Sequence, residues 1–160
     1  MKPDSSRRRF IRNAVAAGAA AGSSPAHAQA TGRVRGFDHV ALPMQNTEAM
    51  LAFYRGLGWE VRENANACSV FCGDNMINFH RPARWQSAEF KLRAPAAKPP
   101  CGDLCFVWEG TPASLKAMLD RAGAKIIEGP GERQGGRKKI GSSVYVRDPD
   151  GNLLEFMIYS

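Results

Sequence analysis

The amino-acid sequence predicts an α+β fold built from two βαβββ modules. Two observations lead to this fold class. Each half of the chain places one amphipathic helical segment among short alternating strands, and the two halves repeat the same order. The first module covers about residues 33–81 and the second about residues 101–160. Between them, residues 82–100 contain four prolines, which is typical of a linker.

The first module begins with apolar–polar alternation over residues 37–42, which predicts a strand. Asn46 or Thr47 is suited to cap the helix that follows, and Gly58 to end it. One face of this helix is apolar at the spacing i, i+3, i+4, i+7 and consists of Met50, Phe53, Tyr54 and Leu57. Three short strands are expected next, at residues 59–63, 67–71 and 76–80.

The second module repeats this pattern. A strand is expected at residues 103–108, and then a helix with Thr111 as its cap, Pro112 at its first position and Gly123 at its end. Three more strands are expected at residues 125–128, 143–147 and 153–159, with a turn at residues 148–151 before the last. The two halves align without gaps at both ends, because His39 and Asp103 each precede the cap position Thr47 or Thr111 by eight residues.

The segment 129–139 is rich in glycine and basic residues and is expected to be a mobile loop. It is not a phosphate-binding loop, because Arg137 stands after the second glycine that the motif requires, no Ser or Thr follows in place, and a strand is expected next rather than a helix. A solvated loop and a lid that favours anionic ligands remain as alternatives.

Side chains alternate across a strand, so each predicted strand has an apolar and a more polar face. The apolar faces are expected to pack on the helices. The opposite faces carry five polar side chains: His39, Asn78, His80, Asp103 and Glu155. Polar groups at such positions cost free energy unless they are paired, hydrated or bound to a ligand. Alternation alone therefore leaves two alternatives, a solvated sheet surface and a common ligand-binding surface.

Three segments carry a resemblance to a known family: FDHVAL at 37–42, FYRGLGWEV at 53–61 and VYVRDPDGNLLEFMIY at 144–159. The sequence resembles the vicinal oxygen chelate superfamily of glyoxalases, bleomycin-resistance proteins and extradiol dioxygenases, and is most similar to its glyoxalase-domain-containing subgroup. This resemblance implies that the sheets of the two modules curl into a cup that holds a divalent metal ion, with the helices outside.

The resemblance also implies which residues bind the metal, since the family takes its ligands from the first and last strands of each module. Those positions are His39, Asn78, Asp103 and Glu155. His39 and Glu155 match the usual ligand types, whereas Asn78 and Asp103 depart from them, and His80 is an alternative to Asn78 on the same face. Imidazole, amide and carboxylate donors suit Mn, Fe, Ni, Zn or Mg. Glu155 is also the candidate catalytic base.

Two functions follow from the resemblance. The first is a metal-dependent lyase, isomerase or dioxygenase that acts on a small molecule with two vicinal oxygens, which the metal polarises as a Lewis acid. The alternative is a metal-free protein that binds or sequesters a small molecule, as bleomycin-resistance proteins do. Members of the family commonly form dimers, so a homodimer is expected.

Residues 1–28 are interpreted as a signal peptide. Paired arginines precede Phe10, a mild apolar stretch follows, and small residues end at Ala28, which is typical of twin-arginine export to the periplasm. The apolar stretch is too weak for a stable membrane anchor. Residues 1–28 contain five of the 22 basic and one of the 15 acidic residues, so the remaining chain has a net charge of +3. This modest charge argues against a nucleic-acid partner.

The four cysteines permit disulfides in an oxidising compartment. Cys68 and Cys72 are four residues apart in one strand, as are Cys101 and Cys105, which is too far for a bond within either pair. A cross pair such as Cys72 with Cys101 and four small buried side chains remain as alternatives.

Overall fold

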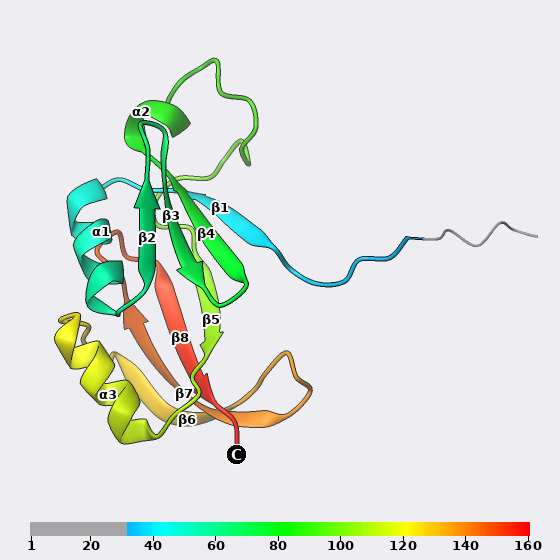
Figure 1. Ribbon diagram of the computed structural model, residues 1–160, viewed down its shortest axis with the longest axis vertical. Coiled ribbons are helices and arrows are strands. Elements are labelled where there is room, and N and C mark those ends of the chain that lie inside the picture. Colours follow the sequence, from blue (N-terminus) through cyan, green and yellow to red (C-terminus); the bar gives the residue numbers. More distant parts are fainter. Residues whose placement is uncertain (1–31) are drawn as a thin grey trace, which may run out of the picture. The chain divides into compact units, whose positions relative to one another are not determined.

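Both modules adopt the predicted order of one strand, one helix and three strands. The computed structural model describes residues 32–160, of which Gly36–Ser160 form one compact unit (Figure 1). The first module consists of β1 (His39–Pro43), α1 (Thr47–Gly56), β2 (Glu60–Glu63), β3 (Ala67–Cys72) and β4 (Asn75–His80). The second consists of β5 (Asp103–Val107), α3 (Pro112–Arg121), β6 (Glu128–Gln134), β7 (Ile140–Arg147) and β8 (Leu153–Ile158). No helix within these residues is long and apolar enough to cross a membrane.

Each module forms its own four-stranded mixed sheet, and the two sheets have equivalent strand orders, β1-β4-β3-β2 and β5-β8-β7-β6. The first strand of each module runs parallel to the last, and the other pairs are antiparallel. The register is equivalent as well, because Ala41 lies opposite Asn78 as Cys105 lies opposite Glu155. The internal repeat read from the sequence is therefore a repeat of structure.

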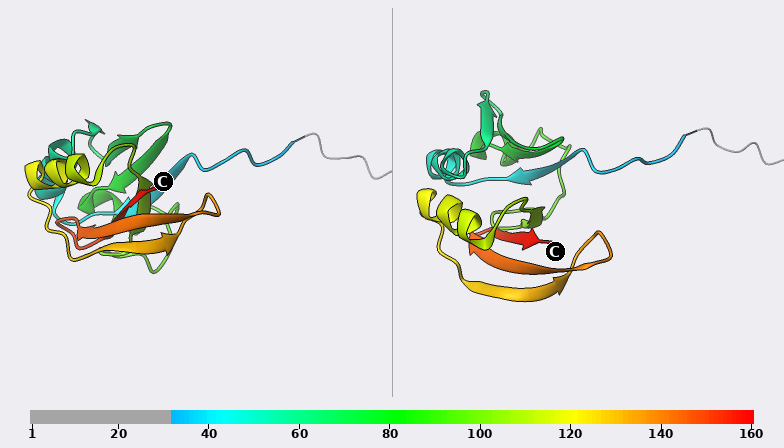
Figure 2. Two further views of the ribbon diagram at one scale, coloured as in Figure 1. Left: turned by 90° about the horizontal axis from the view of Figure 1, so that it is seen from below. Right: turned by 60° about the horizontal axis from the view of Figure 1, so that its bottom comes forward.

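The helices α1 and α3 lie on the same side of the molecule in every view (Figures 1 and 2). Their apolar faces join the apolar faces of both sheets in one core, whose largest buried side chains include Tyr54, Phe79, Phe156, Met50, Met118 and Leu119. The predicted cap of α3 is confirmed, since Thr111 Oγ1 accepts a hydrogen bond of 3.1 Å from the Ser114 amide. Burial of the apolar faces of α1 and α3 supplies most of the stability of such short helices.

The turn between β7 and β8 joins the two modules. Tyr54 of α1 donates its hydroxyl proton to Asp148 Oδ2 over 3.0 Å. Asp150 accepts hydrogen bonds from the backbone amides of Gln45 (2.6 Å) and Asn46 (2.8 Å), immediately before α1. Asn46 is the residue at the cap position of α1, but its side chain makes no capping hydrogen bond to the helix and instead donates to Asp150 Oδ1 at 2.9 Å. A carboxylate from the second module thus lies at the amino end of α1, where the helix dipole favours negative charge.

The prediction of a loop at residues 129–139 is wrong for residues 129–134, which belong to a strand. Residues 128–134 form β6, and the strand expected at residues 125–128 is absent apart from Glu128. Sequence preference is misleading here, because Gly129, Pro130 and Gly131 are poor strand formers. They are tolerated because β6 is an edge strand that pairs only with β7, with a register irregularity between Glu128 and Gly131.

The linker between the modules is folded. It contains a short helix, α2 (Pro82–Trp85), and Trp85 Nε1 donates a hydrogen bond of 2.8 Å to the carbonyl of Met44. Phe90 is buried against the first module with 9% of its surface exposed. The linker therefore covers part of the first sheet, which the proline-rich sequence alone did not indicate.

Candidate functional site

The predicted division of strand faces is confirmed. Ile77 and Phe79 of β4, and Leu154 and Phe156 of β8, lie in the core, each at most 3% exposed. The other faces carry the predicted polar residues, with Asn78, His80 and Glu155 half-buried and His39 and Asp103 exposed. The structure therefore places all five candidate residues on the sheet faces that point away from the helices.

On the first module, His39, Asn78 and His80 line one hollow of about 450 Å³. Nδ1 of His39 lies 2.5 Å from Asp38 Oδ1. A carboxylate on Nδ1 holds the imidazole ring in place and leaves Nε2 available, an arrangement typical of histidine ligands of metals. Asn78 Oδ1 accepts a long hydrogen bond of 3.4 Å from Ser69 Oγ. His39 and Asn78 can therefore both present a donor atom to the hollow.

His80 is more enclosed than His39. The ring of Phe90, from the linker, meets the His80 ring edge-on with the centroids 4.9 Å apart. The guanidinium of Arg84 lies over the Phe90 ring, 4.0 Å from its centroid. Burial, and secondly the charge of Arg84, lower the pKa of His80 from its usual value. His80 is therefore neutral over a wider pH range than a free histidine and forms part of the wall of the hollow.

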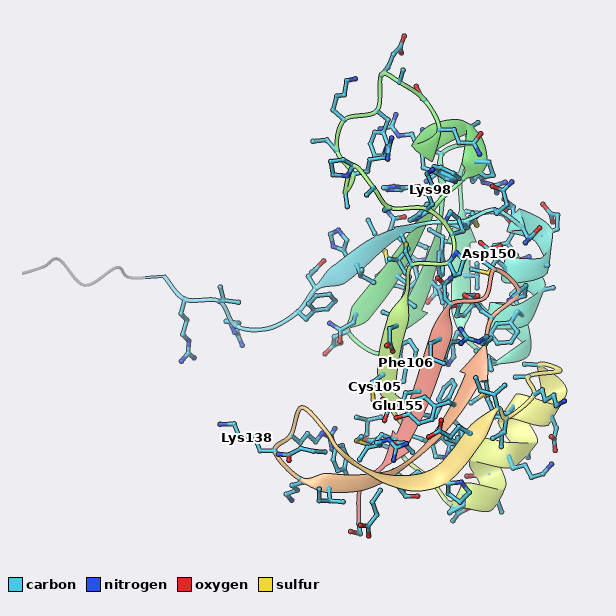
Figure 3. All side chains as sticks on the ribbon, turned by 180° about the vertical axis from the view of Figure 1, so that it is seen from behind. Lys98, Cys105, Phe106, Lys138, Asp150 and Glu155 are labelled. Carbon is cyan, nitrogen blue, oxygen red and sulfur yellow. The ribbon has the colours of Figure 1, made fainter. Side chains whose placement is uncertain are left out.

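On the second module, Glu155 lies between Cys105 of β5 and Tyr145 of β7, each opposite it in the strand register. Figure 3 shows Cys105 and Glu155 next to each other on neighbouring strands. Glu155 Oε1 is enclosed and has no well-formed hydrogen bond among residues 32–160, although the Cys105 thiol and the Tyr145 hydroxyl lie near enough to its carboxylate to interact with it as donors. An enclosed carboxylate with so few well-formed hydrogen bonds is costly, which makes Glu155 a candidate ligand-binding residue.

The thiol of Cys105 is held in its protonated form. Burial raises the pKa of Cys105 to about 12, and the negative charges of Glu155 and Asp103 contribute in the same direction. A protonated thiol is a poor nucleophile. Cys105 therefore shares the face of Asp103 and Glu155 without being an activated cysteine.

Arg133 and Tyr145 are two further polar residues of this face that sequence reasoning missed. Arg133 Nε donates a hydrogen bond of 3.1 Å to the Tyr145 hydroxyl, and its guanidinium pairs with Glu128 at 2.5 Å. Burial raises the pKa of Tyr145, as does the neighbouring Glu155 carboxylate, while Arg133 opposes the shift. Tyr145 falls within a strand that the sequence predicted, so its alternation with Val144 and Val146 was the available signal. Arg133 was hidden in the segment interpreted as a loop.

The two sets of candidate ligands lie on two different sheets. Within residues 32–160, no group of three or more His, Cys, Asp or Glu side chains is placed to hold a metal ion. The hollow beside His39 is lined only by residues of the first module and the linker. A single chain thus brings His39, Asn78 and His80 together, and Cys105 together with Glu155, but it does not form one five-residue cluster.

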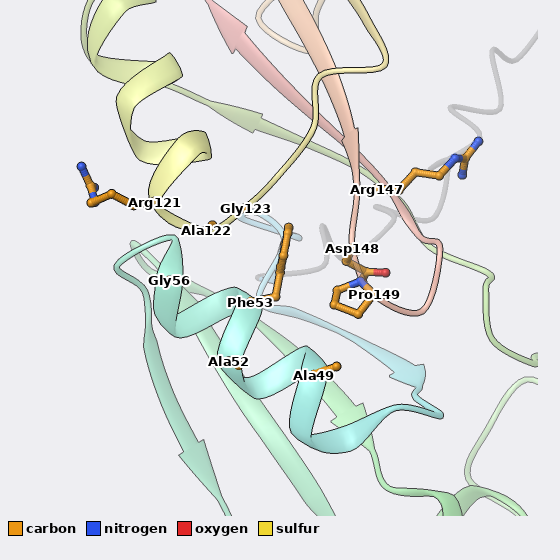
Figure 4. A pocket seen from close by; sticks show the side chains of 10 residues that line it. All are labelled: Ala49, Ala52, Phe53, Gly56, Arg121, Ala122, Gly123, Arg147, Asp148 and Pro149. Atoms are coloured by element: carbon orange, nitrogen blue, oxygen red, sulfur yellow. The ribbon is translucent and has the colours of Figure 1, made fainter.

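A second hollow of about 490 Å³ lies on the helix side of the molecule, between α1, the end of α3 and the β7–β8 turn (Figure 4). Small residues such as Ala52 and Gly56 line it, with Arg121 and Arg147 at its rim. A Cβ atom on Gly56 would lie 3.0 Å from Ala122 Cα, so glycine allows the two helices to approach closely here. None of the predicted site residues lines this hollow.

All four cysteines are free thiols, and no disulfide joins them. Cys68 is buried in β3, whereas Cys101 and Cys105 are exposed. The cross pair of Cys72 with Cys101, one of the two alternatives from the sequence, is therefore absent from the structure. Cys72 and Cys105 instead line one groove between the edges of the two sheets.

The sequence model of the Glyoxalase/Bleomycin resistance protein/Dioxygenase superfamily matches residues 36–156. The chain belongs to this superfamily. Virulence protein STM3117 of Salmonella typhimurium is 35% identical over 124 residues, which are 76% of this chain and 83% of that protein. The crystal structure of STM3117 superposes with a TM-score of 0.70 at 31% identity, covering 80% of this chain and 98% of that one.

A second relative supports the same superfamily, and a more distant structure shares the fold. Glyoxalase domain-containing protein RDO1 of Mycosarcoma maydis is 33% identical over 127 residues, 79% of this chain and 69% of that protein. Lactoylglutathione lyase from Agrobacterium tumefaciens superposes with a TM-score of 0.59 at 21% identity over 78% of this chain and 94% of that one. The latter likeness concerns the fold alone. Together these findings confirm the resemblance and the α+β fold of two modules, and they leave the reaction open.

Proposed function

We propose that this superfamily member is a metal-dependent enzyme that acts on a small molecule with two vicinal oxygens. The observation that carries the proposal is the enclosed Glu155 carboxylate, whose Oε1 has no well-formed hydrogen bond among residues 32–160 and which has the Cys105 thiol and the Tyr145 hydroxyl beside it. It is supported by His39, whose Nδ1 is held by Asp38. An available carboxylate and an imidazole held through its Nδ1 are both typical of metal-binding residues.

The donor set of the proposed site fits a divalent first-row metal or Mg. His39 and Asn78 would supply an imidazole and an amide oxygen, and Asp103 and Glu155 two carboxylates; His80 is the alternative to Asn78. One imidazole among oxygen donors favours Mn, Fe or Mg over metals that prefer nitrogen or sulfur. When bound, the metal would polarise two neighbouring substrate oxygens as a Lewis acid. Glu155 is the residue that would take a proton from the substrate carbon.

A homodimer would complete the site. Each sheet carries half of the donor set, so neither half can saturate a metal ion alone. In a twofold dimer each contact occurs twice. The polar sheet face of the first module of each copy would then lie against the polar sheet face of the second module of the other copy. Such a dimer would form two equivalent sites, each with His39 and Asn78 from one chain and Asp103 and Glu155 from its partner copy.

The proposal is tested by titrating the chelator-treated protein with Mn²⁺, Ni²⁺ and Zn²⁺ and measuring the dissociation constants. The variant Glu155→Gln keeps the shape of the side chain and removes its charge, so metal affinity should fall by at least about 100-fold. Glu132→Gln, on the exposed part of β6, is the matched control and should bind metal normally. Equal affinities for Glu155→Gln and the unmodified protein would reject the assignment.

A metal-free binding protein is the second candidate, and the identity of Asn78 favours it. An amide is a weak metal ligand, and this amide already accepts a hydrogen bond from Ser69. In that case the first-module hollow would bind a small molecule directly. Ligand binding that is unchanged by chelator, together with metal affinity that is unchanged by Glu155→Gln, would favour this function.

We also propose that the protein is exported to the periplasm by the twin-arginine pathway. The paired arginines, the mild apolar stretch and the small residues before Ala28 support it, and residues 1–28 lie outside the described residues. Joint replacement of Arg7 and Arg8 by Lys should retain the protein in the cytoplasm, and the amino terminus of the exported protein should be Gln29. Export that is independent of both arginines would contradict the pathway.

A further inference from the structure

Two arginines of the linker lie beside the face that carries His39 and Asn78. Arg84 of α2 lines the same hollow as these residues, with its guanidinium stacked 4.0 Å from the centroid of the Phe90 ring. Arg93 lines an adjoining hollow of about 400 Å³, which shares Ala41, His80 and Leu92 with the first. The two arginines thus line two hollows that share His80.

No carboxylate neutralises these arginines within residues 32–160. Neither hollow has an Asp or Glu in its lining, and neither Arg84 nor Arg93 makes a salt bridge in this part of the chain. Arg93 Nη1 donates to the carbonyl of Pro95 at 3.0 Å, but its Nε is enclosed and without a hydrogen-bond partner.

Arg62 provides a contrast within the same module. Its guanidinium also lies over a phenylalanine ring, 5.0 Å from the centroid of Phe71, but it pairs with Glu60 at 2.5 Å. Stacking on an aromatic ring therefore does not by itself leave an arginine without an acidic partner in this protein. The hollow beside His39 differs because its polar lining offers histidines, amides and hydroxyls, with Arg84 as its charged group.

The charge balance of the proposed site also favours an anionic ligand. A divalent metal ion would be neutralised by the two carboxylates Asp103 and Glu155, so the positive charges of Arg84 and Arg93 would remain. Guanidinium groups bind carboxylates and phosphates through two parallel hydrogen bonds. We propose that the hollows beside His80 bind the oxyanion group of an acidic substrate, with Arg84 and Arg93 as its recognition residues.

This inference rests on the proposed function, since it names the substrate class of the same site: a small molecule that carries a carboxylate or phosphate close to its vicinal oxygens. Arg84 lines the same first-module hollow as His39, so the anionic group would be held there while the vicinal oxygens face the proposed metal ligands. Neutral compounds with the same vicinal oxygens should bind much more weakly.

The experiment uses the full chain after treatment with chelator, with inorganic phosphate and oxalate as probes and isothermal titration calorimetry as the measurement. Arg84→Gln should weaken binding of both probes at least tenfold, and Arg93→Gln should weaken it as well. Arg84→Lys, which keeps the charge and loses the paired hydrogen bonds, should lie between Arg84→Gln and the unmodified protein. Arg62→Gln, the matched control on Phe71, should bind both probes normally.

Three results would overturn the inference. The first is no saturable binding of either probe, and the second is an equal loss of affinity in Arg84→Gln and Arg62→Gln. The third is an Arg84→Gln variant that binds the probes normally while its dimer dissociates more readily, since Arg84 would then pair with a carboxylate of a second copy. Because the probes are measured without metal, each of these results is independent of the metal titration that tests the proposed function.

Discussion

The hydroxyl of Tyr54 and the carboxylate of Asp148 meet over 3.0 Å, although the two residues are 94 positions apart in the chain. Asp148 also accepts hydrogen bonds from the backbone and side chain of Asn152, at 2.9 and 2.8 Å. The RDPDGN segment is thus a structural junction that attaches the β7–β8 turn to α1. The candidate ligand Glu155 follows three residues after Asn152, so the same segment fixes the start of the strand that carries it.

The junction should contribute measurably to stability. Tyr54→Phe removes one hydrogen bond to a buried carboxylate and should lower the free energy of unfolding by about 2 kcal/mol. Asp148→Asn sets an amide against the Asn152 side-chain amide and should cost on the order of 1–3 kcal/mol. Denaturant unfolding of both single variants and the double variant measures their coupling. Additive effects would show that the two groups do not interact.

Tyr54 should also make the protein sensitive to alkali. Burial, followed by the charge of Asp148, raises the pKa of Tyr54 well above its usual value of 10.0. The unfolded chain ionises this tyrosine near pH 10 and the folded chain does not, so this contribution to stability is complete below pH 10 and is lost as the pH rises above it. Melting temperatures between pH 8 and 11 should therefore fall less steeply for Tyr54→Phe. Melting temperatures that fall equally with pH in Tyr54→Phe and in the unmodified protein would contradict this explanation.

Tyr145 is expected to position Glu155. It lies opposite Glu155 on the next strand and is itself held by Arg133 at 3.1 Å. Residues that orient a metal ligand commonly contribute 10- to 100-fold to affinity, so Tyr145→Phe should weaken metal binding about tenfold. Tyr159→Phe, one residue beyond the end of β8, is the control and should bind metal normally. Equal dissociation constants for the two variants would exclude this role.

Cys105 should react slowly with iodoacetamide. Its pKa of about 12 leaves little thiolate at pH 8, although the residue is exposed. Peptide mass spectrometry after timed alkylation should find Cys101 modified before Cys105. Removal of the neighbouring charge in Glu155→Gln lowers the pKa of Cys105 and should accelerate its alkylation, while burial, the larger cause, still keeps the rate low. Faster alkylation of Cys105 than of Cys101 would contradict this.

The sequence predicted those parts of the fold that depend on local periodicity and capping. The helix after Thr111 and the strand faces of Ile77 and Phe79 follow from side-chain spacing alone. β6 was not predicted, because an edge strand with glycine and proline forms through pairing with β7 and not through its own preference. The folded linker was missed for a similar reason, since Phe90 becomes buried only against a sheet that is distant in sequence.

The sheet faces that carry the candidate residues were predicted from the sequence, but the relative placement of the two faces was not. Alternation correctly placed His39, Asn78 and Glu155 on the faces opposite the helices. Strand patterns carry no information on how two sheets are oriented, so the expected common surface did not follow from them. The enclosed oxygen of Glu155 and its neighbour Tyr145 depend on register, which is set by tertiary structure.

The central claim is a metal site shared between two copies of the chain, and a mixed dimer tests it most directly. Chains with His39→Ala and chains with Glu155→Gln are co-expressed with different affinity tags, and the mixed dimer is isolated by both tags. One of its two sites would combine an intact His39 with an intact Glu155, so its metal content should be about half that of the unmodified dimer. Each variant alone should bind almost no metal. A mixed dimer as empty as the single variants, beside an unmodified protein that binds metal, would contradict the shared site.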